Sequence, residues 1–132
     1  MTLLLGLGII GSRSADQLIA AGHPLKTWNR TAKDRPETTP DLTEAASQAD
    51  VILCYLRDDQ AVREVFSQIK DHLKEGKTFI NHATIDPETT LWLERHCKAA
   101  GGNFLDAPFT GSREAAACGS LVYYVAGDRD LL

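Results

Sequence analysis

The residues best suited to chemistry stand near the amino terminus, in the stretch Gly6-Leu7-Gly8-Ile9-Ile10-Gly11. This is a G-x-G-x-x-G pattern placed between an apolar run and a helix-like segment. The first glycine of such a turn permits the bend, the second lets a pyrophosphate approach the backbone, and the third lets helix and strand pack closely. Backbone N–H groups and the helix dipole then hold the negative charge. The pattern predicts a dinucleotide site; the alternative is a plain glycine-rich turn.

A second candidate, Asn29-Arg30-Thr31, follows the next apolar stretch. An NAD site has Asp or Glu near this place to accept hydrogen bonds from the ribose hydroxyls, and this chain has no acid there. The Arg30 guanidinium can instead bind a 2′-phosphate through paired, charge-assisted hydrogen bonds and stack on adenine. Asn29 and Thr31 can donate to phosphate oxygens. We therefore predict NADP(H) over NAD(H) as the cofactor; the alternative is a solvated loop arginine.

Other reactive side chains form no recognisable catalytic or metal-binding set. His82 follows an apolar stretch at the sheet edge where doubly wound folds bind ligands, which makes it a candidate for proton transfer. The spacing of the three cysteines, Cys54, Cys97 and Cys118, suits neither a metal site nor an even set of disulfides. We expect them to be buried free thiols, and we expect no metal.

Strand-like and helix-like stretches alternate along the whole chain, which predicts an α/β fold with a doubly wound, mostly parallel sheet (a Rossmann fold) and helices on both faces. Residues 1–132 are expected to form one domain. The expected helices are Gly8–Ala21, Asp41–Gln48, an amphipathic helix carrying Val62, Val65, Phe66, Ile69 and Leu73, and a helix from Asp86-Pro87 to Gly101-Gly102. The expected strands are Thr2–Leu5, Leu25–Trp28, Val51–Leu56, Thr78–Ile80, Asn103–Leu105 and Leu121–Ala126.

Composition narrows the class of protein. The chain has 132 residues, a net charge of −4 and 43% hydrophobic residues, which are ordinary values for a globular domain. The negative charge argues against a nucleic-acid partner, and no apolar run is long enough to cross a membrane. The apolar first ten residues carry no Lys or Arg and contain two glycines, so they are predicted to be strand and turn rather than signal peptide. We therefore expect a cytoplasmic protein.

Four stretches in this order resemble the N-terminal domain of the β-hydroxyacid dehydrogenases, which include 3-hydroxyisobutyrate dehydrogenase and 6-phosphogluconate dehydrogenase. The resemblance spans essentially the whole chain. The stretches are the glycine turn with Asn29-Arg30-Thr31, the run Val51–Leu56 followed by Arg57-Asp58-Asp59, the segment 81–87 (NHATIDP), and the segment 106–112 (DAPFTGS) with its continuation through Gly119-Ser120-Leu121 to Val125-Ala126-Gly127.

The resemblance assigns roles to residues beyond the glycine turn. Leu56, Arg57 and Thr84 would contact the ribose and nicotinamide side of the cofactor. The segment Thr110-Gly111-Ser112 would hold a substrate carboxylate through a hydroxyl and backbone N–H groups; the alternative is a loop of small residues between two strands. The chain departs from the family pattern at Arg57, where proline is usual, at Ala83, where serine is usual, and at Ser112, where glycine is usual.

The resemblance also implies what lies outside these residues. The family's general acid–base lysine stands beyond residue 132, in an all-helical domain that builds the homo-oligomer, so we expect no catalytic residue within this chain. The expected function is the cofactor domain of an NADP-dependent oxidoreductase acting on a small 3-hydroxy acid or its semialdehyde. Two alternatives are a catalytically silent NADP(H)-binding module and a related imine reductase.

Overall fold

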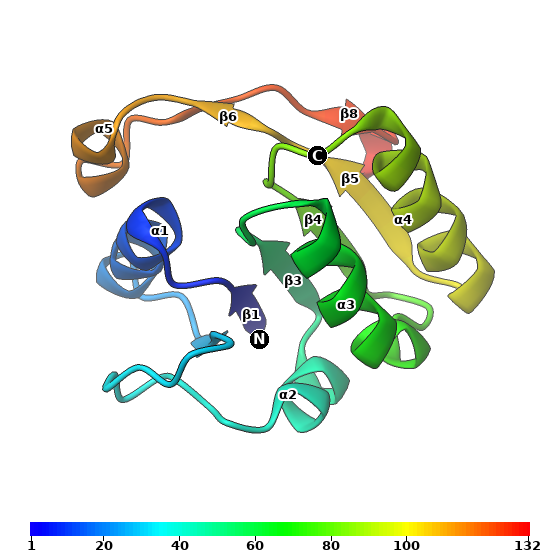
Figure 1. Ribbon diagram of the computed structural model, residues 1–132, viewed down its shortest axis with the longest axis horizontal. Helices are drawn as coiled ribbons and strands as arrows, with labels where there is room; N and C mark the ends of the chain where they lie inside the picture. The colour runs from blue at the N-terminus through cyan, green and yellow to red at the C-terminus, as the bar shows by residue number, and fades with distance from the viewer.

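The computed structural model describes residues 1–132 and has a six-stranded sheet with the strand order β2-β1-β3-β4-β5-β8 (Figure 1). The first five strands are parallel, and β8 runs antiparallel to β5. This confirms the predicted doubly wound fold. The sheet strands are β1 (Thr2–Leu5), β2 (Leu25–Trp28), β3 (Val51–Cys54), β4 (Thr78–Asn81), β5 (Asn103–Asp106) and β8 (Ala126–Gly127), while β6 (Phe109–Thr110) and β7 (Val122–Tyr123) form a separate antiparallel pair.

Helices cover both faces of the sheet, as predicted. The helices are α1 (Ile9–Ala20), α2 (Leu42–Gln48), α3 (Asp59–Ile69), α4 (Pro87–Ala100) and α5 (Arg113–Ala117), with short 3₁₀ turns at Lys70–His72 and Arg129–Leu131. The larger core packs α2, α3 and α4 against Leu3 and Leu5, and a smaller core packs α1 against Leu4. Alternate residues of β1 therefore point into opposite cores, which explains its unbroken apolar run.

Aspartate side chains cap the amino termini of three helices, and a glycine ends one of these helices. The side chains of Asp41, Asp58 and Asp86 accept backbone N–H groups at the starts of α2, α3 and α4. Gly101 ends α4 in the left-handed conformation at φ 92°. These short-range signals explain why the predicted starts of α2 and α4, and the predicted end of α4, agree closely with the structure. None of the helices is long and apolar enough to span a bilayer.

The carboxyl-terminal third departs most from the prediction. The expected strand Leu121–Ala126 is wrong, because Val122–Tyr123 pairs with Phe109–Thr110 while Ala126–Gly127 pairs with β5. The Tyr124 N–H donates to the Pro108 carbonyl between these two pairings, so the chain changes partner there. The short helix α5, which the sequence analysis did not predict, forms behind a cap from Ser112.

Three smaller expectations also need correction. The strand expected over Val51–Leu56 ends at Cys54. The stripe from Val62 to Leu73 is not one helix, since α3 ends at Ile69 and a 3₁₀ turn carries the chain on to Leu73. Cys54 and Cys97 are buried, but Cys118 is exposed after the end of α5. All three cysteines are free, as predicted.

The packing of α1 against the sheet gives a stability prediction at Gly11. A Cβ placed there would lie 1.9 Å from the Gly6 carbonyl oxygen, so helix and strand would have to separate. We expect Gly11→Ala to lower the free energy of unfolding by about 2–3 kcal/mol, the usual cost of overpacking. Urea unfolding measures it. The matched control is Gly8→Ala, where a Cβ meets nothing within 4 Å; equal losses in the two variants would contradict this packing argument.

Candidate functional site

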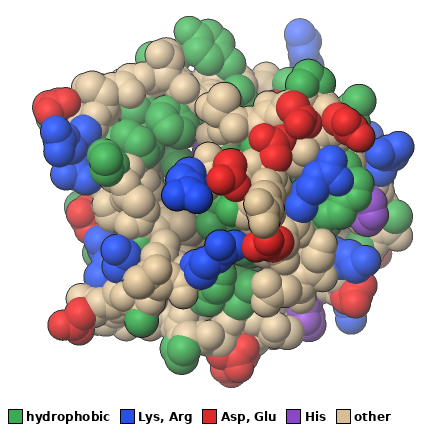
Figure 2. Space-filling view, in the orientation of Figure 1, with side chains coloured by type: hydrophobic (Ala, Val, Ile, Leu, Met, Phe, Trp, Pro, Cys, Tyr) green, Lys and Arg blue, Asp and Glu red, His purple; other side chains and the backbone are tan.

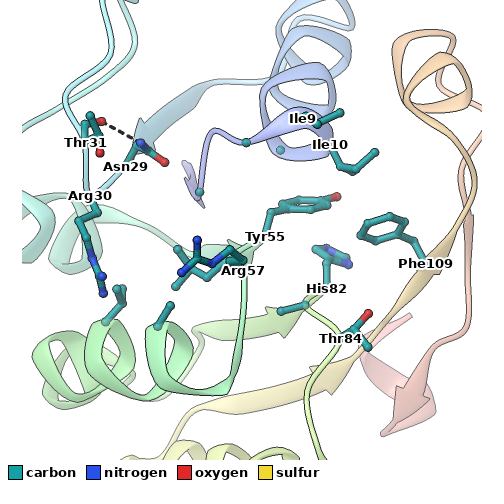
Figure 3. A pocket seen from close by; sticks show the side chains of 17 residues that line it. Ile9, Ile10, Asn29, Arg30, Thr31, Tyr55, Arg57, His82, Thr84 and Phe109 are labelled. Atoms are coloured by element: carbon teal, nitrogen blue, oxygen red, sulfur yellow. Dashed lines mark hydrogen bonds between the residues drawn. The ribbon is translucent and has the colours of Figure 1, made fainter.

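A cavity of about 610 Å³ lies at the carboxyl ends of the parallel strands, between α1 and α3 (Figure 3). Doubly wound sheets bind ligands at this edge, where the strand order reverses beside the first strand. The predicted cofactor residues that line it are Gly6, Gly8, Ile9, Ile10, Gly11, Asn29, Arg30, Thr31, Leu56, Arg57 and Thr84. The structure therefore brings together residues from four separate segments of the chain.

Two glycines of the turn, Gly6 and Gly11, allow close packing, whereas Gly8 leaves open space in the cavity. Gly6 has a φ of 96°, and a Cβ there would lie 2.7 Å from the Tyr55 carbonyl oxygen. Gly11 allows α1 to start directly beside that bend. Gly8 instead lines the cavity, and a Cβ added to it would enter open space. The first and third glycines thus permit the fold, whereas the second keeps a surface free for a ligand to approach the backbone.

The amino terminus of α1 lacks the side-chain cap that the other α-helices have. Its N-cap residue is Gly8, no side chain accepts a hydrogen bond there, and its first turn carries no acidic residue. Each of α2 to α5 has an Asp or Ser side chain at this place. The exposed N–H groups and the positive end of the helix dipole consequently face the cavity and favour an anion.

Asn29 ties the glycine turn to the loop after β2. Its Oδ1 accepts the Leu7 N–H at 2.8 Å, and its Nδ2 donates to the Thr31 carbonyl at 2.8 Å. Both polar ends of the amide are therefore engaged within the protein, so Asn29 positions the turn in this structure. Leu7 is only 5% exposed and does not line the cavity, because it packs beside Leu4 and Ala15.

Two guanidinium groups stand at the outer part of the cavity (Figure 3). The Arg30 side chain is 64% exposed, and its Nη2 lies 2.6 Å from Glu64 Oε2 on α3. The Arg57 side chain is 91% exposed, with Asp58 at 3.4 Å. Sequence reasoning missed Glu64, because nothing local to its position indicates that Arg30 lies beside it.

Aromatic side chains form the inner wall. The ring of Tyr55 stacks on His82 with centroids 4.5 Å apart, and Phe109 lies 6.1 Å from Tyr55. The Tyr55 hydroxyl is hydrogen-bonded to the Tyr123 hydroxyl at 2.8 Å. Tyr55 and His82 also line a second, mainly apolar cavity of about 470 Å³ on the α1 and α5 side. Sequence reasoning missed Tyr55 and Phe109, which it treated as parts of strands or motifs.

His82 is 7% exposed, and its Nδ1 lies 2.8 Å from the Ala107 carbonyl oxygen. Burial lowers the pKa of His82, while the Ala107 carbonyl and the nearby Asp106 carboxylate oppose that shift. Its neutral form therefore donates from Nδ1, which leaves Nε2 as an acceptor. Burial also raises the pKa of the Tyr55 hydroxyl, and the Tyr123 hydroxyl adds to that effect. Both groups are uncharged at neutral pH.

The predicted substrate segment lies outside the cavity. Thr110, Gly111 and Ser112 do not line it, although the neighbouring Phe109 does. Thr110 belongs to β6, Gly111 has a φ of 140°, and the Ser112 hydroxyl oxygen accepts the Ala115 N–H at the start of α5. The chain also contains no cluster of three or more His, Cys, Asp or Glu side chains that could hold a metal.

Comparison with known proteins decides the family. The sequence profile of the NAD binding domain of 6-phosphogluconate dehydrogenase matches residues 3–132.

The chain belongs to the family of 6-phosphogluconate dehydrogenase NAD-binding domains.

Two solved structures have the same fold as this domain, and a curated relative is similar to it in sequence. The domain superimposes on Mycobacterium tuberculosis 3-hydroxyisobutyrate dehydrogenase in complex with L-serine with a TM-score of 0.91 and 25% identity, over 98% of this chain and 47% of that one. It has the fold of the Aspergillus terreus reductive aminase solved with NADPH, at TM-score 0.78 and 23% identity, over 86% of this chain and 42% of that one. The cytokine-like nuclear factor N-PAC of Danio rerio is 34% identical over 96% of this chain.

This NAD-binding domain spans less than a third of the N-PAC relative, 30% of its length. The resemblance to 6-phosphogluconate and 3-hydroxyisobutyrate dehydrogenases expected from the four sequence stretches is confirmed, and it covers the N-terminal domain of those enzymes.

Acidic and basic side chains are interspersed over the face shown in Figure 2, without a large field of one sign.

Burial of His82 gives a pH prediction. Because its pKa is lower in the folded than in the unfolded state, the unfolded chain binds the proton more readily and stability falls as pH drops below about 6.5. We expect the thermal midpoint to decrease from about pH 7.5 to about pH 5.5 and this slope to flatten in His82→Asn. That variant keeps an N–H donor for Ala107 without a titrating ring.

The control for this measurement is His23→Asn, at an exposed position after α1. It should keep the wild-type slope. The carboxyls whose pKa the structure lowers, Asp50 and Asp59, titrate well below this pH window. An unchanged slope in His82→Asn would show that another group carries the pH dependence.

Proposed function

We propose that this domain binds NADP(H) and presents its nicotinamide to a small 3-hydroxy acid or the corresponding semialdehyde, as part of an oxidoreductase. The observation that carries the proposal is the uncapped amino terminus of α1, which faces the cavity beside Gly8. A diphosphate is the group that such a terminus accommodates best, because its charge meets both the free N–H groups and the helix dipole.

The residues present fit a dinucleotide along the cavity. Gly8 and the first turn of α1 would hold the pyrophosphate, Arg30 and Thr31 the adenosine end, and Thr84 the nicotinamide end. The neutral rings of Tyr55 and His82 exclude water from the inner wall and place no charge there. When bound, the nicotinamide supplies or accepts the hydride, and the protein fixes its position.

The preference for NADP(H) rests on charge at the end of β2. No acidic residue stands between Trp28 and Thr31, so a 2′-phosphate meets no carboxylate from this strand. The Arg30 guanidinium lines the cavity and is exposed enough to reorient toward a ligand. The guanidinium is a delocalised cation with a fork of N–H donors, so it binds a phosphate more strongly than it binds a ribose hydroxyl.

Several finer expectations belong to this proposal. The substrate is a small carboxylate held through Thr110-Gly111-Ser112, which would have to approach the cavity from their position beside Phe109. A lysine beyond residue 132 transfers the proton, and an all-helical segment beyond this domain forms the homo-oligomer.

The proposed location is the cytoplasm. The curated relatives carry the word nuclear in their name, so a test of location compares the cytoplasm with the nucleus.

A second candidate is a cofactor-binding module without catalysis. Ala83 favours it, because alanine lines the cavity where the family usually has a serine hydroxyl. The curated relatives also favour it, since N-PAC is described as a nuclear factor rather than as a dehydrogenase. The imine reductase alternative, which came from the shared glycine turn and Asn29-Arg30-Thr31, gains only a shared fold from solved imine reductases at 20% and 23% identity.

The cofactor preference is tested with Arg30→Ala. We expect wild-type protein to bind NADPH more tightly than NADH, and the variant to lose about tenfold to hundredfold in NADPH affinity, because charge-assisted hydrogen bonds to the 2′-phosphate disappear. NADH affinity should stay within about twofold, since NADH lacks that phosphate. Titration calorimetry of both cofactors gives the dissociation constants.

Two variants control this titration. Arg95→Ala removes one exposed positive charge from α4, outside the residues that line the cavity, and should leave both affinities unchanged. Gly8→Ala places a methyl group against the proposed pyrophosphate and should weaken both cofactors alike. Equal wild-type affinities for NADPH and NADH would refute the preference.

Turnover separates the enzyme from the silent module. We expect residues 1–132 to bind NADPH and to show no oxidation of it with small semialdehydes, because the proton-transferring lysine lies elsewhere. Absorbance of NADPH follows the reaction. In the longer protein, a Lys–Asn pair one helical turn apart after residue 132 would support the enzyme, and its absence would favour the silent module. Robust turnover by residues 1–132 alone would contradict our placement of catalysis.

A further inference from the structure

The cation proposed for the 2′-phosphate already has a counter-charge. Arg30 Nη2 lies 2.6 Å from Glu64 Oε2, although the two residues are 34 positions apart in the sequence. Glu64 stands on α3 between Ala61 and Val65, which both line the cavity. Its carboxylate therefore lies at the adenosine end of the site, on the opposite wall from β2.

The Glu64 carboxylate is held from its own helix as well. Gln60 Nε2 donates to Glu64 Oε1 at 2.9 Å, one turn earlier on α3, while Oε2 faces Arg30. The two oxygens thus have different partners, and the amide of Gln60 keeps the carboxylate in place when Arg30 moves. The Arg30 and Glu64 side chains are 64% and 47% exposed, so their attraction is weakened by water and the pair can open.

We propose that Glu64 is a selectivity-determining residue that opposes the 2′-phosphate of NADP(H) by occupying Arg30. The inference rests on the proposed function and specifies its electrostatics. A 2′-phosphate carries up to two negative charges, so its binding requires Arg30 to turn from Glu64 and leaves two anions facing each other across the site. NAD(H) has no phosphate there and leaves the ion pair intact.

The acid that β2 lacks is thus supplied from α3, but in a different role. At the end of β2 an acid would accept the ribose hydroxyls and exclude a phosphate. Glu64 instead acts through the guanidinium that it holds, so it lowers the affinity for NADP(H) without providing a new contact for NAD(H). The discrimination between the two cofactors is then the balance of Arg30 against Glu64.

The test is a comparison of Glu64→Gln with its matched control, Glu94→Gln. Glu94 also pairs with a cation on an exposed helix, with Lys98 at 2.8 Å, but α4 does not line the cavity. Both variants remove one negative charge and keep side-chain length. Dissociation constants are measured for NADPH, NADH, 2′,5′-ADP and 5′-AMP, at low and high salt, in the wild-type and Arg30→Ala backgrounds.

Glu64→Gln is expected to tighten NADPH and 2′,5′-ADP about fivefold, the size that an exposed charge pair allows, with NADH and 5′-AMP changed less than about twofold. The gain should shrink at high salt, and it should be smaller in the Arg30→Ala background, where only the direct repulsion between Glu64 and the phosphate is left to remove. Glu94→Gln should change none of the four.

Two results overturn the inference alone: Arg30→Ala weakens NADPH while Glu64→Gln leaves it unchanged, or Glu64→Gln weakens NADH, which would make Glu64 a partner of the ribose. If Arg30→Ala affects neither cofactor, the proposed 2′-phosphate site fails, and the role of Glu64 fails with it.

Discussion

The close contact between Gly11 and the carbonyl of Gly6 is the constraint on which the site depends. Because neither residue has a side chain, α1 begins directly against the end of β1 and beside β3. The helix can therefore point its uncapped N–H groups into the cavity and not into a neighbouring loop. In each of the other α-helices a side chain accepts one of these N–H groups, so α1 is the α-helix whose amino terminus is left without a side-chain cap beside the cavity.

The polar residues around this terminus fall into two kinds. Asn29 has both ends of its amide engaged by the backbone, so it fixes the distance between the glycine turn and the loop after β2. Arg30 and Glu64 are exposed and face each other across the opening. A rigid inner frame with adjustable charges at its edge suits a ligand whose diphosphate is constant and whose adenosine end differs by one phosphate group.

The inner wall of the cavity is aromatic and uncharged, unlike its charged opening. Tyr55, His82 and Phe109 are packed rings, and burial keeps the histidine neutral. Tyr55 and His82 line both this cavity and the apolar cavity on the other side, so they form a wall that the two cavities share. The segment Thr110-Gly111-Ser112 stands just outside, in the part of the chain that changes pairing partner after β5.

The sequence by itself determined the parts that depend on neighbours along the chain: the glycine turn, the aspartate caps, the apolar strands of a parallel sheet, and hence the family. These features rest on backbone conformation and hydrogen bonds within a few residues. Tertiary structure alone decided the split of Leu121–Ala126 between two partners, the aromatic wall, and the meeting of Arg30 with Glu64. Those outcomes depend on contacts between segments far apart in the chain, which only the packing of helices on the sheet brings together.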